Sequence, residues 1–259
     1  MKYKALMVDV DGTLIPYQYE SFPSKNVISS LLEAQKKLAV CLVTGRAYNA
    51  IEPILNALPG TSYAVTNGGA VVIDIKTKKA IYEEPITYAS AKEIVQILRQ
   101  ENVPFYLKSD MYEGASDSGP FNNSDTFQKA YMIYALEDYT DEKITKLFSL
   151  FSHMTDLTLH KSKHKKPNHF GFNITHARAT KLHGIVSVCE KLNIKREEVI
   201  GVGDGYNDFP LLMASGLKVA MGNAIPELKT IADYIAPSVT EDGICDVINT
   251  FILNGKTDM

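Results

Sequence analysis

Apolar segments in the first and last parts of the chain predict the strands of a buried parallel sheet. Residues 3–8, 40–43 and 199–203 are almost entirely apolar or glycine. Strands that helices cover on both faces have this composition, because neither side of such a strand meets water. Shorter strands are predicted at residues 63–66, 70–75 and 80–82.

Helix-like spacing of apolar residues follows these strands at residues 47–58 and 182–192, and it recurs at residues 209–214 and 240–250. The middle of the chain mixes helical and alternating patterns, which is typical of an α+β module with an antiparallel sheet. The pattern there predicts helices at residues 90–101 and 141–151, and strands at residues 105–109, 131–136, 157–160 and 169–174.

The residues that could carry chemistry occur in the first and last parts of the chain and not between them. We therefore predict an α/β fold with a Rossmann-like parallel-sheet core, residues 1–83 and 179–259, and an inserted α+β domain, residues 84–178. A chain of 259 residues, 45% of them hydrophobic, can form two such domains, since domains commonly have about 100–200 residues.

Two carboxylates stand directly after the first strand. Asp9 and Asp11 precede Gly12, which lets the chain turn sharply. Open α/β sheets bind ligands at the carboxyl ends of their strands, and neighbouring carboxylates repel each other unless a cation lies between them. The pattern therefore predicts an active site that holds Mg²⁺, which prefers hard oxygen ligands. The alternative is an ordinary turn, where Asp and Gly are common.

Thr44 and Gly45 follow the second apolar strand. A hydroxyl group there can donate to an anionic oxygen, and the free backbone N–H groups of a following helix favour negative charge. These features indicate a phosphate-binding loop. Instead of binding phosphate, Thr44 could equally well be the N-cap residue of that helix. The neighbouring Arg46 would contact either the substrate or an acidic residue on the surface.

Further charged residues lie late in the chain. Lys181 stands at the start of a predicted helix, where the macrodipole disfavours a cation, so we expect a functional reason for it; a solvated side chain is the alternative. Asp204 and Asp208 lie in a glycine-flanked loop after the third apolar strand, with Asn207 between them. They complete an oxygen coordination shell with Asp9, unless the loop is only a solvated turn.

Together these four segments resemble the haloacid dehalogenase superfamily, whose motifs run Asp-X-Asp, then Thr or Ser, then Lys, then Gly-Asp-X-X-X-Asp. The resemblance covers nearly the whole chain, and residues 66–69 and 220–224 are similar to the Cof-type branch. That branch implies a catalytic core with a large α/β cap, residues 84–178. Substrate would enter at the boundary between the cap and the core. It also implies Mg²⁺-dependent hydrolysis of small phosphorylated metabolites such as sugar phosphates.

The same resemblance implies a role for each motif residue. Asp9 would be the nucleophile that forms an aspartyl-phosphate, and Asp11 the acid and base. Thr44 would hold a phosphoryl oxygen, and Lys181 would neutralise charge on the nucleophile and the transferring group. The metal-binding residues would be Asp9, Asp11 through its carbonyl oxygen, Asp204 and Asp208. Other substrate or phosphate contacts would come from Gly45, Arg46, Asn67, Asn207 and Asn223.

Two groups of polar residues have a second interpretation. Asn67 and Asn223 suit turns with a left-handed backbone at least as well as a binding site. Residues 160–169 form the most basic stretch of the chain. This stretch is either a solvated hairpin loop or, through Lys161 and Lys163, a contact for an anionic substrate.

The composition limits the partners. A formal charge of -3 argues against a general nucleic-acid binder. Three widely spaced cysteines suit a reducing compartment. The chain starts on a predicted strand rather than a leader, and no apolar run approaches the ~20 residues of a membrane span. We expect a cytoplasmic protein with a small phosphorylated metabolite as its partner, and no nucleic-acid or membrane partner; its oligomeric state is not readable from the sequence.

Two other functions fit the same residues. A phosphomutase of the superfamily would return the phosphoryl group to the substrate instead of to water. A metabolite-binding protein without turnover would keep the pocket alone. Release of free phosphate in proportion to the substrate consumed distinguishes a phosphatase from both.

Overall fold

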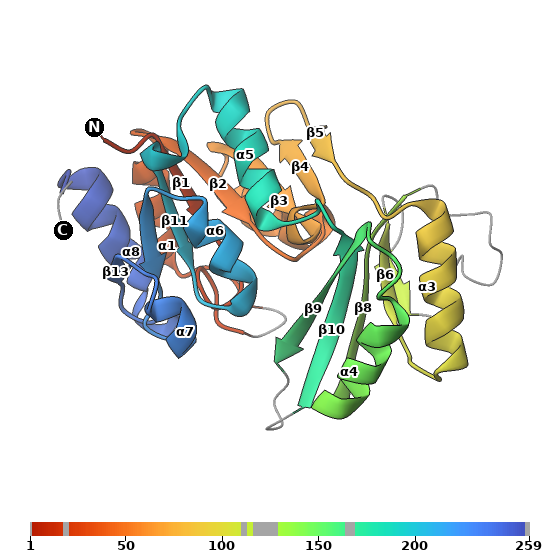
Figure 1. The fold of residues 1–259 in the computed structure, drawn as a ribbon. Coiled ribbons are helices and arrows are strands. Elements are labelled where there is room, and N and C mark those ends of the chain that lie inside the picture. Colours follow the sequence, from red (N-terminus) through yellow and green to blue (C-terminus); the bar gives the residue numbers. More distant parts are fainter. Residues whose placement is uncertain (1, 18–20, 110–112, 116–128, 164–168, 257–259) are drawn as a thin grey trace. The chain divides into compact units, whose positions relative to one another are not determined.

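The computed structural model describes residues 2–17, 21–109, 113–115, 129–163 and 169–256. Its chain divides into two compact units (Figure 1). Unit 1 consists of Met1–Tyr82 and Thr180–Met259, and unit 2 consists of Glu83–Ala179. Unit 2 is therefore inserted between the two segments of unit 1, and each of its ends lies one residue outside the predicted range 84–178.

Unit 1 is built on one sheet. Its strands are β1 (Ala5–Val8), β2 (Ala39–Val43), β3 (Thr61–Thr66), β4 (Val71–Asp74), β5 (Lys79–Glu83), β11 (Val199–Gly203), β12 (Leu217–Ala220) and β13 (Tyr234–Ile235). They form eight strands in the order β13-β12-β11-β1-β2-β3-β4-β5. The strands from β13 to β3 in this order run parallel, and β4 runs antiparallel to β3.

Helices cover both faces of this sheet. One face packs against α1 (Lys25–Gln35), α2 (Tyr48–Ala57) and α8 (Gly243–Val247), and the other against α5 (Lys181–Leu192), α6 (Phe209–Met213) and α7 (Pro226–Lys229). Along β1, Leu6 and Val8 belong to the first core, whereas Ala5 and Met7 belong to the second. Successive strand residues point to opposite faces, so a strand covered on both sides is apolar at every position. Short helices complete the unit: η1 (Asn67–Gly69), η3 (Arg196–Glu198), η4 (Tyr206–Asp208), η5 (Val239–Glu241) and η6 (Ile248–Leu253).

Unit 2 has a separate core. Its strands are β6 (Tyr106–Ser109), β7 (Glu113–Ala115), β8 (Ala130–Thr140), β9 (Leu157–Lys163) and β10 (His169–His176), and its helices are α3 (Tyr88–Gln100) and α4 (Asp141–Leu150). The strands form an antiparallel sheet in the order β7-β6-β8-β10-β9. Both helices pack in one core with the sheet, and Phe172 lies fully buried within it.

The predicted fold class, an α/β core with an inserted α+β domain, is confirmed. Two local predictions need correction, and five elements were not predicted. Residues 161–163 continue strand β9, so they are not part of a hairpin loop, and Lys161 pairs with Asp141 and lies over the Phe170 ring. The predicted helix at residues 240–250 is interrupted at Asp242, whose φ of 54° is left-handed. The unpredicted elements α1, β7, β12, β13 and α7 also contribute to the fold. The Lys163 side chain and residues 164–168 lie outside what the structure describes.

Phe172 tests the core of unit 2. Its ring packs edge-on against Phe148, with 5.9 Å between centroids, and is fully buried. We expect Phe172→Ala to lower the free energy of unfolding by about 3–5 kcal/mol, because it removes buried apolar surface and leaves a cavity. Phe22→Ala is the matched control, since Phe22 is 48% exposed. Urea unfolding followed by circular dichroism suits a chain without tryptophan; equal effects of the two variants would contradict the assignment.

Candidate active site

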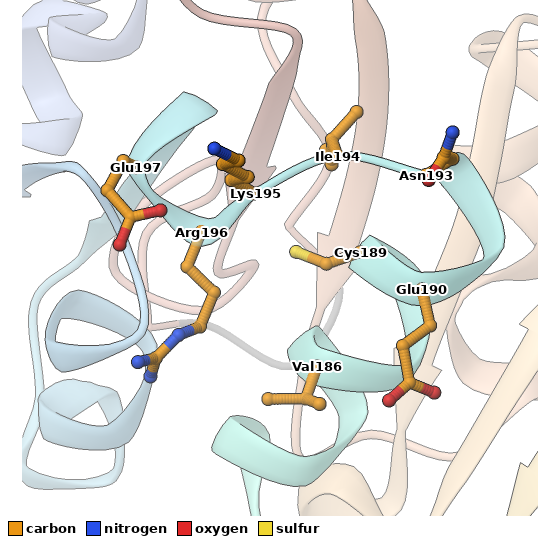
Figure 2. Close-up of a pocket in the computed structure, with 8 residues that line it drawn as sticks. All are labelled: Val186, Cys189, Glu190, Asn193, Ile194, Lys195, Arg196 and Glu197. Carbon is orange, nitrogen blue, oxygen red and sulfur yellow. The ribbon is translucent and has the colours of Figure 1, made fainter.

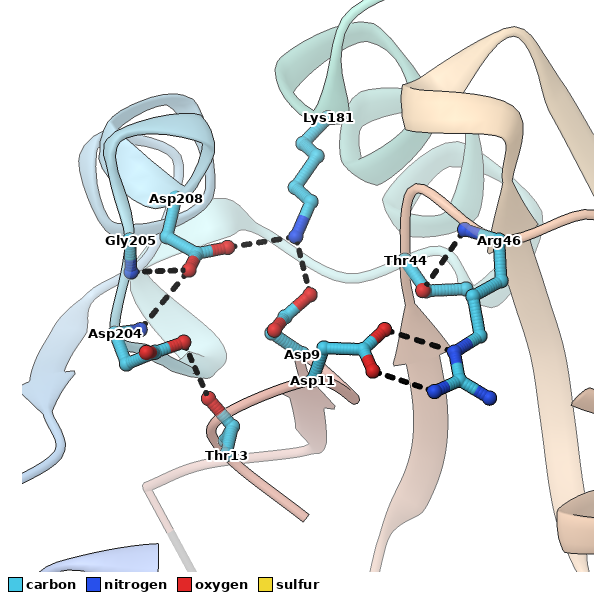
Figure 3. A network of polar contacts seen from close by, with 9 residues as sticks. All are labelled: Asp9, Asp11, Thr13, Thr44, Arg46, Lys181, Asp204, Gly205 and Asp208. Atoms are coloured by element: carbon cyan, nitrogen blue, oxygen red, sulfur yellow. Dashed lines mark hydrogen bonds and ion pairs between the residues drawn. The ribbon is translucent and has the colours of Figure 1, made fainter. Parts of the chain in front are cut away.

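Three neighbouring strands bring the predicted site residues to one edge of the sheet in unit 1 (Figure 3). Asp9 follows β1, Thr44 follows β2 and Asp204 follows β11. Parallel strands end at the same edge, so residues far apart in sequence meet there. Lys181, the first residue of α5, reaches the same group.

A buried ion cluster forms the centre of the site. The Nζ atom of Lys181 lies 2.5 Å from Oδ1 of Asp9 and 2.6 Å from Oδ1 of Asp208. The three side chains are 2%, 5% and 0% exposed. Water cannot solvate these charges, so each depends on the others for compensation. A solvated side chain, the alternative for Lys181, is therefore wrong.

The charges in the cluster shift one another's proton affinity. Burial alone would lower the pKa of Lys181, but Asp208 and Asp9 outweigh burial and raise it above its ordinary value, so the ammonium stays charged. Burial raises the pKa of Asp9 well above its ordinary value, and the Asp208 charge adds to this while Lys181 opposes it. Burial and the Asp208 charge therefore raise the pKa of Asp9 by more than Lys181 lowers it.

The loop after β11 holds the other two acids. Oδ2 of Asp208 accepts hydrogen bonds from the backbone N–H groups of Asp204 and Gly205, both at 2.9 Å. Asp208 therefore fixes the shape of the loop as well as the position of Lys181. Burial raises the pKa of Asp204 to about 7, with a further contribution from the Asp208 charge; hydrogen bonds from Tyr17 and Thr13 oppose the shift.

This arrangement fits a divalent cation. Asp9, Asp204 and Asp208 each offer a carboxylate oxygen, and these oxygens lie within 4.8 Å of one another. All three residues are buried, and their negative charge exceeds that of the one lysine among them. Hard oxygen donors with excess negative charge are the ligands that Mg²⁺ selects. The donor set is thus suited to Mg²⁺.

The loop after β2 does not cap a helix through Thr44. The N-cap residue of α2 is Ala47, and its side chain makes no capping bond. Instead, the buried Thr44 hydroxyl accepts the backbone N–H of Arg46 at 3.1 Å. This bond orients the hydroxyl, whose proton can then be donated to an anionic oxygen. A side chain at Gly45 would meet no described atom within 4 Å, so space is open above this loop.

Arg46 pairs with Asp11. The Arg46 Nε donates to Oδ2 of Asp11 at 2.8 Å, and the Arg46 Nη2 donates to Oδ1 of Asp11 at 2.6 Å (Figure 3). The two side chains are 21% and 30% exposed. Of the two interpretations of Arg46, an ion pair is therefore observed, but its partner is the predicted site residue Asp11 and not a surface acid.

The three predicted asparagines differ in their surroundings. Asn67 is buried with a left-handed φ of 51°, and its Oδ1 has no partner among the described residues. Asn223 links three loops: its Nδ2 donates to the Gly12 carbonyl at 2.8 Å and to Asp204 at 3.3 Å, and its Oδ1 accepts from the Val239 N–H. Asn207 is exposed in η4.

Two glycines allow the loops to approach one another. Gly12 has a φ of 82°, and a Cβ atom there would collide with Asp204. Gly69 has a φ of 111°, and a Cβ atom there would collide with the backbone carbonyl of Thr180. Glycine at both positions therefore lets Asp204 and the start of α5 come close enough to form the ion cluster.

Two contacts were not expected from the sequence. The Thr13 hydroxyl donates to Oδ1 of Asp204 at 3.4 Å, and Tyr17 also hydrogen-bonds to Asp204. Thr13 directly follows the Asp-X-Asp-Gly segment, so its position is a signal that could have identified it. No comparable pattern marks Tyr17.

A separate hollow of about 450 Å³ lies at the C-terminal end of α5 (Figure 2). None of the residues of the ion cluster lines it. The hollow is lined by Val186, Cys189, Glu190, Asn193, Ile194, Lys195, Arg196 and Glu197.

Over the described ranges, no helix combines the length and the apolar character that crossing a membrane requires.

Comparison with known proteins identifies the family. A family model described as haloacid dehalogenase-like hydrolase matches residues 6–248. The chain therefore belongs to this family, and the resemblance drawn from the order of the motifs is confirmed. It is an enzyme of the hydrolase class.

Relatives extend over the whole chain. Phosphoglycolate phosphatase 1 of Saccharolobus solfataricus is 28% identical over 98% of both chains. Phosphatase YwpJ of Bacillus subtilis is 26% identical over 95% of this chain and 98% of its own. The solved structure of phosphatase BT1666 from Bacteroides thetaiotaomicron has a TM-score of 0.82 at 21% identity and covers 96% of this chain and 95% of its own. The structural likeness shows the shared fold.

The raised pKa of Asp204 predicts a pH dependence of stability in metal-free protein. Between about pH 4 and pH 7 the folded protein keeps a proton on Asp204 that the unfolded chain loses, so stability falls as the pH rises through this window. The free energy of unfolding of the wild type, relative to that of Asp204→Asn, should therefore fall by up to about 1.4 kcal/mol for each pH unit of increase.

Urea unfolding in EDTA at pH 5, 6 and 7 measures this difference. Glu33→Gln is the control, since that carboxyl is 51% exposed and lies in a surface ion pair. A difference between wild type and Asp204→Asn that does not change with pH would contradict the proton on Asp204.

Proposed function

We propose that the protein is a Mg²⁺-dependent phosphatase that hydrolyses small phosphorylated metabolites, with sugar phosphates as the leading class. The observation that carries this proposal is the buried Asp9 carboxylate, held 2.5 Å from the Lys181 ammonium inside an acidic cluster. Full-length relatives named phosphoglycolate phosphatase and phosphatase support the reaction type.

Asp9 is the proposed nucleophile. One of its oxygens attacks phosphorus, the bond from phosphorus to the ester oxygen breaks, and an aspartyl-phosphate results. The Lys181 ammonium contacts Asp9 and is positioned to neutralise charge as the phosphoryl group transfers. Because Asp208 holds Lys181 from the other side, the ammonium is fixed before substrate arrives.

Asp11 is the proposed acid and base. It gives a proton to the departing ester oxygen, and it later takes a proton from the water that attacks the aspartyl-phosphate. The two steps release the alcohol and inorganic phosphate and return Asp9 and Asp11 to their starting forms.

Mg²⁺ would be held by the Asp9 side chain, the Asp11 carbonyl oxygen and Asp204, with Asp208 as the fourth predicted metal residue. When bound, Mg²⁺ supplies positive charge that stabilises the phosphoryl oxygens in the transition state. Asp208 already accepts hydrogen bonds from Lys181, Asp204 and Gly205, so its main contribution in this proposal is to hold those groups in place.

The other residues predicted to contact substrate have different proposed roles. Thr44 and the backbone around Gly45 would bind phosphoryl oxygens, since the Thr44 hydroxyl is oriented by the Arg46 N–H. The Oδ1 of Asn67 is a buried acceptor without a partner in the described part of the chain, so a donor on bound substrate or water would satisfy it. The contacts of Asn223 support an anchoring role, and the exposed Asn207 is open to ligand.

Unit 2 is the proposed cap that sets the choice of substrate. It carries none of the phosphoryl-transfer residues, and its separate hydrophobic core lets it vary without disturbing the ion cluster. Specificity of this kind resides in side chains that contact the organic part of the substrate. Cytoplasmic location is part of the same proposal, as phosphorylated metabolites are found there.

Asp9→Asn tests the covalent step. We expect the kcat for hydrolysis of the best substrate in a phosphate-ester panel to fall on the order of a thousandfold or more, since an amide cannot form the acyl-phosphate. Phosphate release with Mg²⁺ is the measurement, and Asp233→Asn, at a surface ion pair with Lys218, is the control. Normal kcat in Asp9→Asn would contradict the nucleophile, and isomerised esters without free phosphate would indicate a mutase.

A further inference from the structure

The pair between Arg46 and Asp11 engages both oxygens of the Asp11 carboxylate. Both oxygens accept from the guanidinium, at 2.8 Å and 2.6 Å, in the parallel arrangement that a planar guanidinium forms with a carboxylate (Figure 3). An Asp11 held in this way has little freedom to reach another atom. As the proposed acid and base it has to contact the ester oxygen, so at least one of these bonds must open.

The backbone of Arg46 is fixed, whereas its side chain is partly exposed. The Arg46 N–H donates to the Thr44 hydroxyl at 3.1 Å, and the Arg46 carbonyl accepts from the Asn67 N–H at 2.9 Å. The guanidinium, in contrast, is 21% exposed and Asp11 is 30% exposed. Solvent weakens an ion pair at such a position, so the pair can open while the loop stays in place.

The position of Arg46 supplies a second partner. Thr44, the residue proposed to hold a phosphoryl oxygen, is two residues away and hydrogen-bonded to the Arg46 backbone. A phosphoryl group presents two or more oxygens to a guanidinium in the same geometry as a carboxylate, and it carries more negative charge. A phosphoryl group bound at Thr44 therefore competes with Asp11 for the guanidinium.

We propose that Arg46 exchanges partners when substrate binds: its guanidinium leaves Asp11 for the phosphoryl group, and this exchange frees Asp11 to act as acid and base. The proposal rests on the function proposed above. It assigns Arg46 a role in timing as well as in binding, because Asp11 is available only when a phosphoryl group is present. In the exchange the two hydrogen bonds from Arg46 to Asp11 break and no bond between heavy atoms changes; the freed Asp11 carboxylate then takes up from water the proton that it gives to the ester oxygen.

The exchange predicts a pattern of affinities for inorganic phosphate in the presence of Mg²⁺. Arg46→Gln should weaken binding about 10- to 100-fold, because hydrogen bonds to a charged group are lost. Asp11→Asn should strengthen binding at least about threefold, since the amide competes less well for the guanidinium. In the Arg46→Gln/Asp11→Asn double variant the gain should disappear, because no guanidinium remains to be released.

Titration calorimetry with inorganic phosphate measures all four proteins without turnover. Arg196→Gln is the matched control: it removes one arginine charge at the separate hollow and should leave the affinity unchanged (Figure 2). If Asp11→Asn strengthened phosphate binding equally in the wild type and in the Arg46→Gln variant, the effect would come from general electrostatics. That result would overturn the exchange. Weaker phosphate binding by Asp11→Asn would also overturn it, since Arg46 would then need Asp11 in order to bind phosphate.

This test separates the exchange from the proposed function. A protein that hydrolyses phosphate esters but shows no coupling between Asp11 and Arg46 keeps the phosphatase proposal and loses the exchange. A protein that shows the coupling but hydrolyses no ester keeps the exchange as a feature of phosphate binding and loses the phosphatase.

Discussion

Compensation of buried charge at Lys181 is the constraint on which the site depends. Its ammonium is shared between Asp9 and Asp208 at 2.5 and 2.6 Å, with almost no exposure to water. Removing one partner from such a group leaves a buried charge uncompensated and is far more costly than losing a surface pair. When all three carboxyl groups are ionised, one lysine leaves excess negative charge, which a divalent cation would balance.

The fold makes this concentration of charge possible in a small space. β11, β1 and β2 are neighbours, so their carboxyl ends present Asp204, Asp9 and Thr44 side by side. The apolar cores on both sides of the sheet hold these strands in register. Gly69 then lets η1 approach the start of α5, which places Lys181 over the strand ends. The candidate site residues lie in the loops and short helices after the strands and at the start of α5, while the sheet supplies the rigidity.

Much of this architecture is readable from the sequence, for a physical reason. Strands buried on both faces must be apolar throughout, so β1, β2 and β11 stand out, and the charged residues that end them are conspicuous. The pairing of Arg46 with Asp11 is not readable, because it depends on the conformations of two side chains that lie 35 positions apart. Tyr17 near Asp204 and the continuation of β9 to Lys163 depend in the same way on contacts made only after folding.

Anomalous diffraction from crystals grown with Mn²⁺ tests the central claim most directly. Mn²⁺ takes the same oxygen ligands as Mg²⁺ and is visible by its anomalous signal. We predict one ion in unit 1, bound by a carboxylate oxygen of Asp9, a carboxylate oxygen of Asp204 and the carbonyl oxygen of Asp11, with Asp208 beside it. An ion bound to other residues, or none at this cluster at saturating Mn²⁺, would contradict the account.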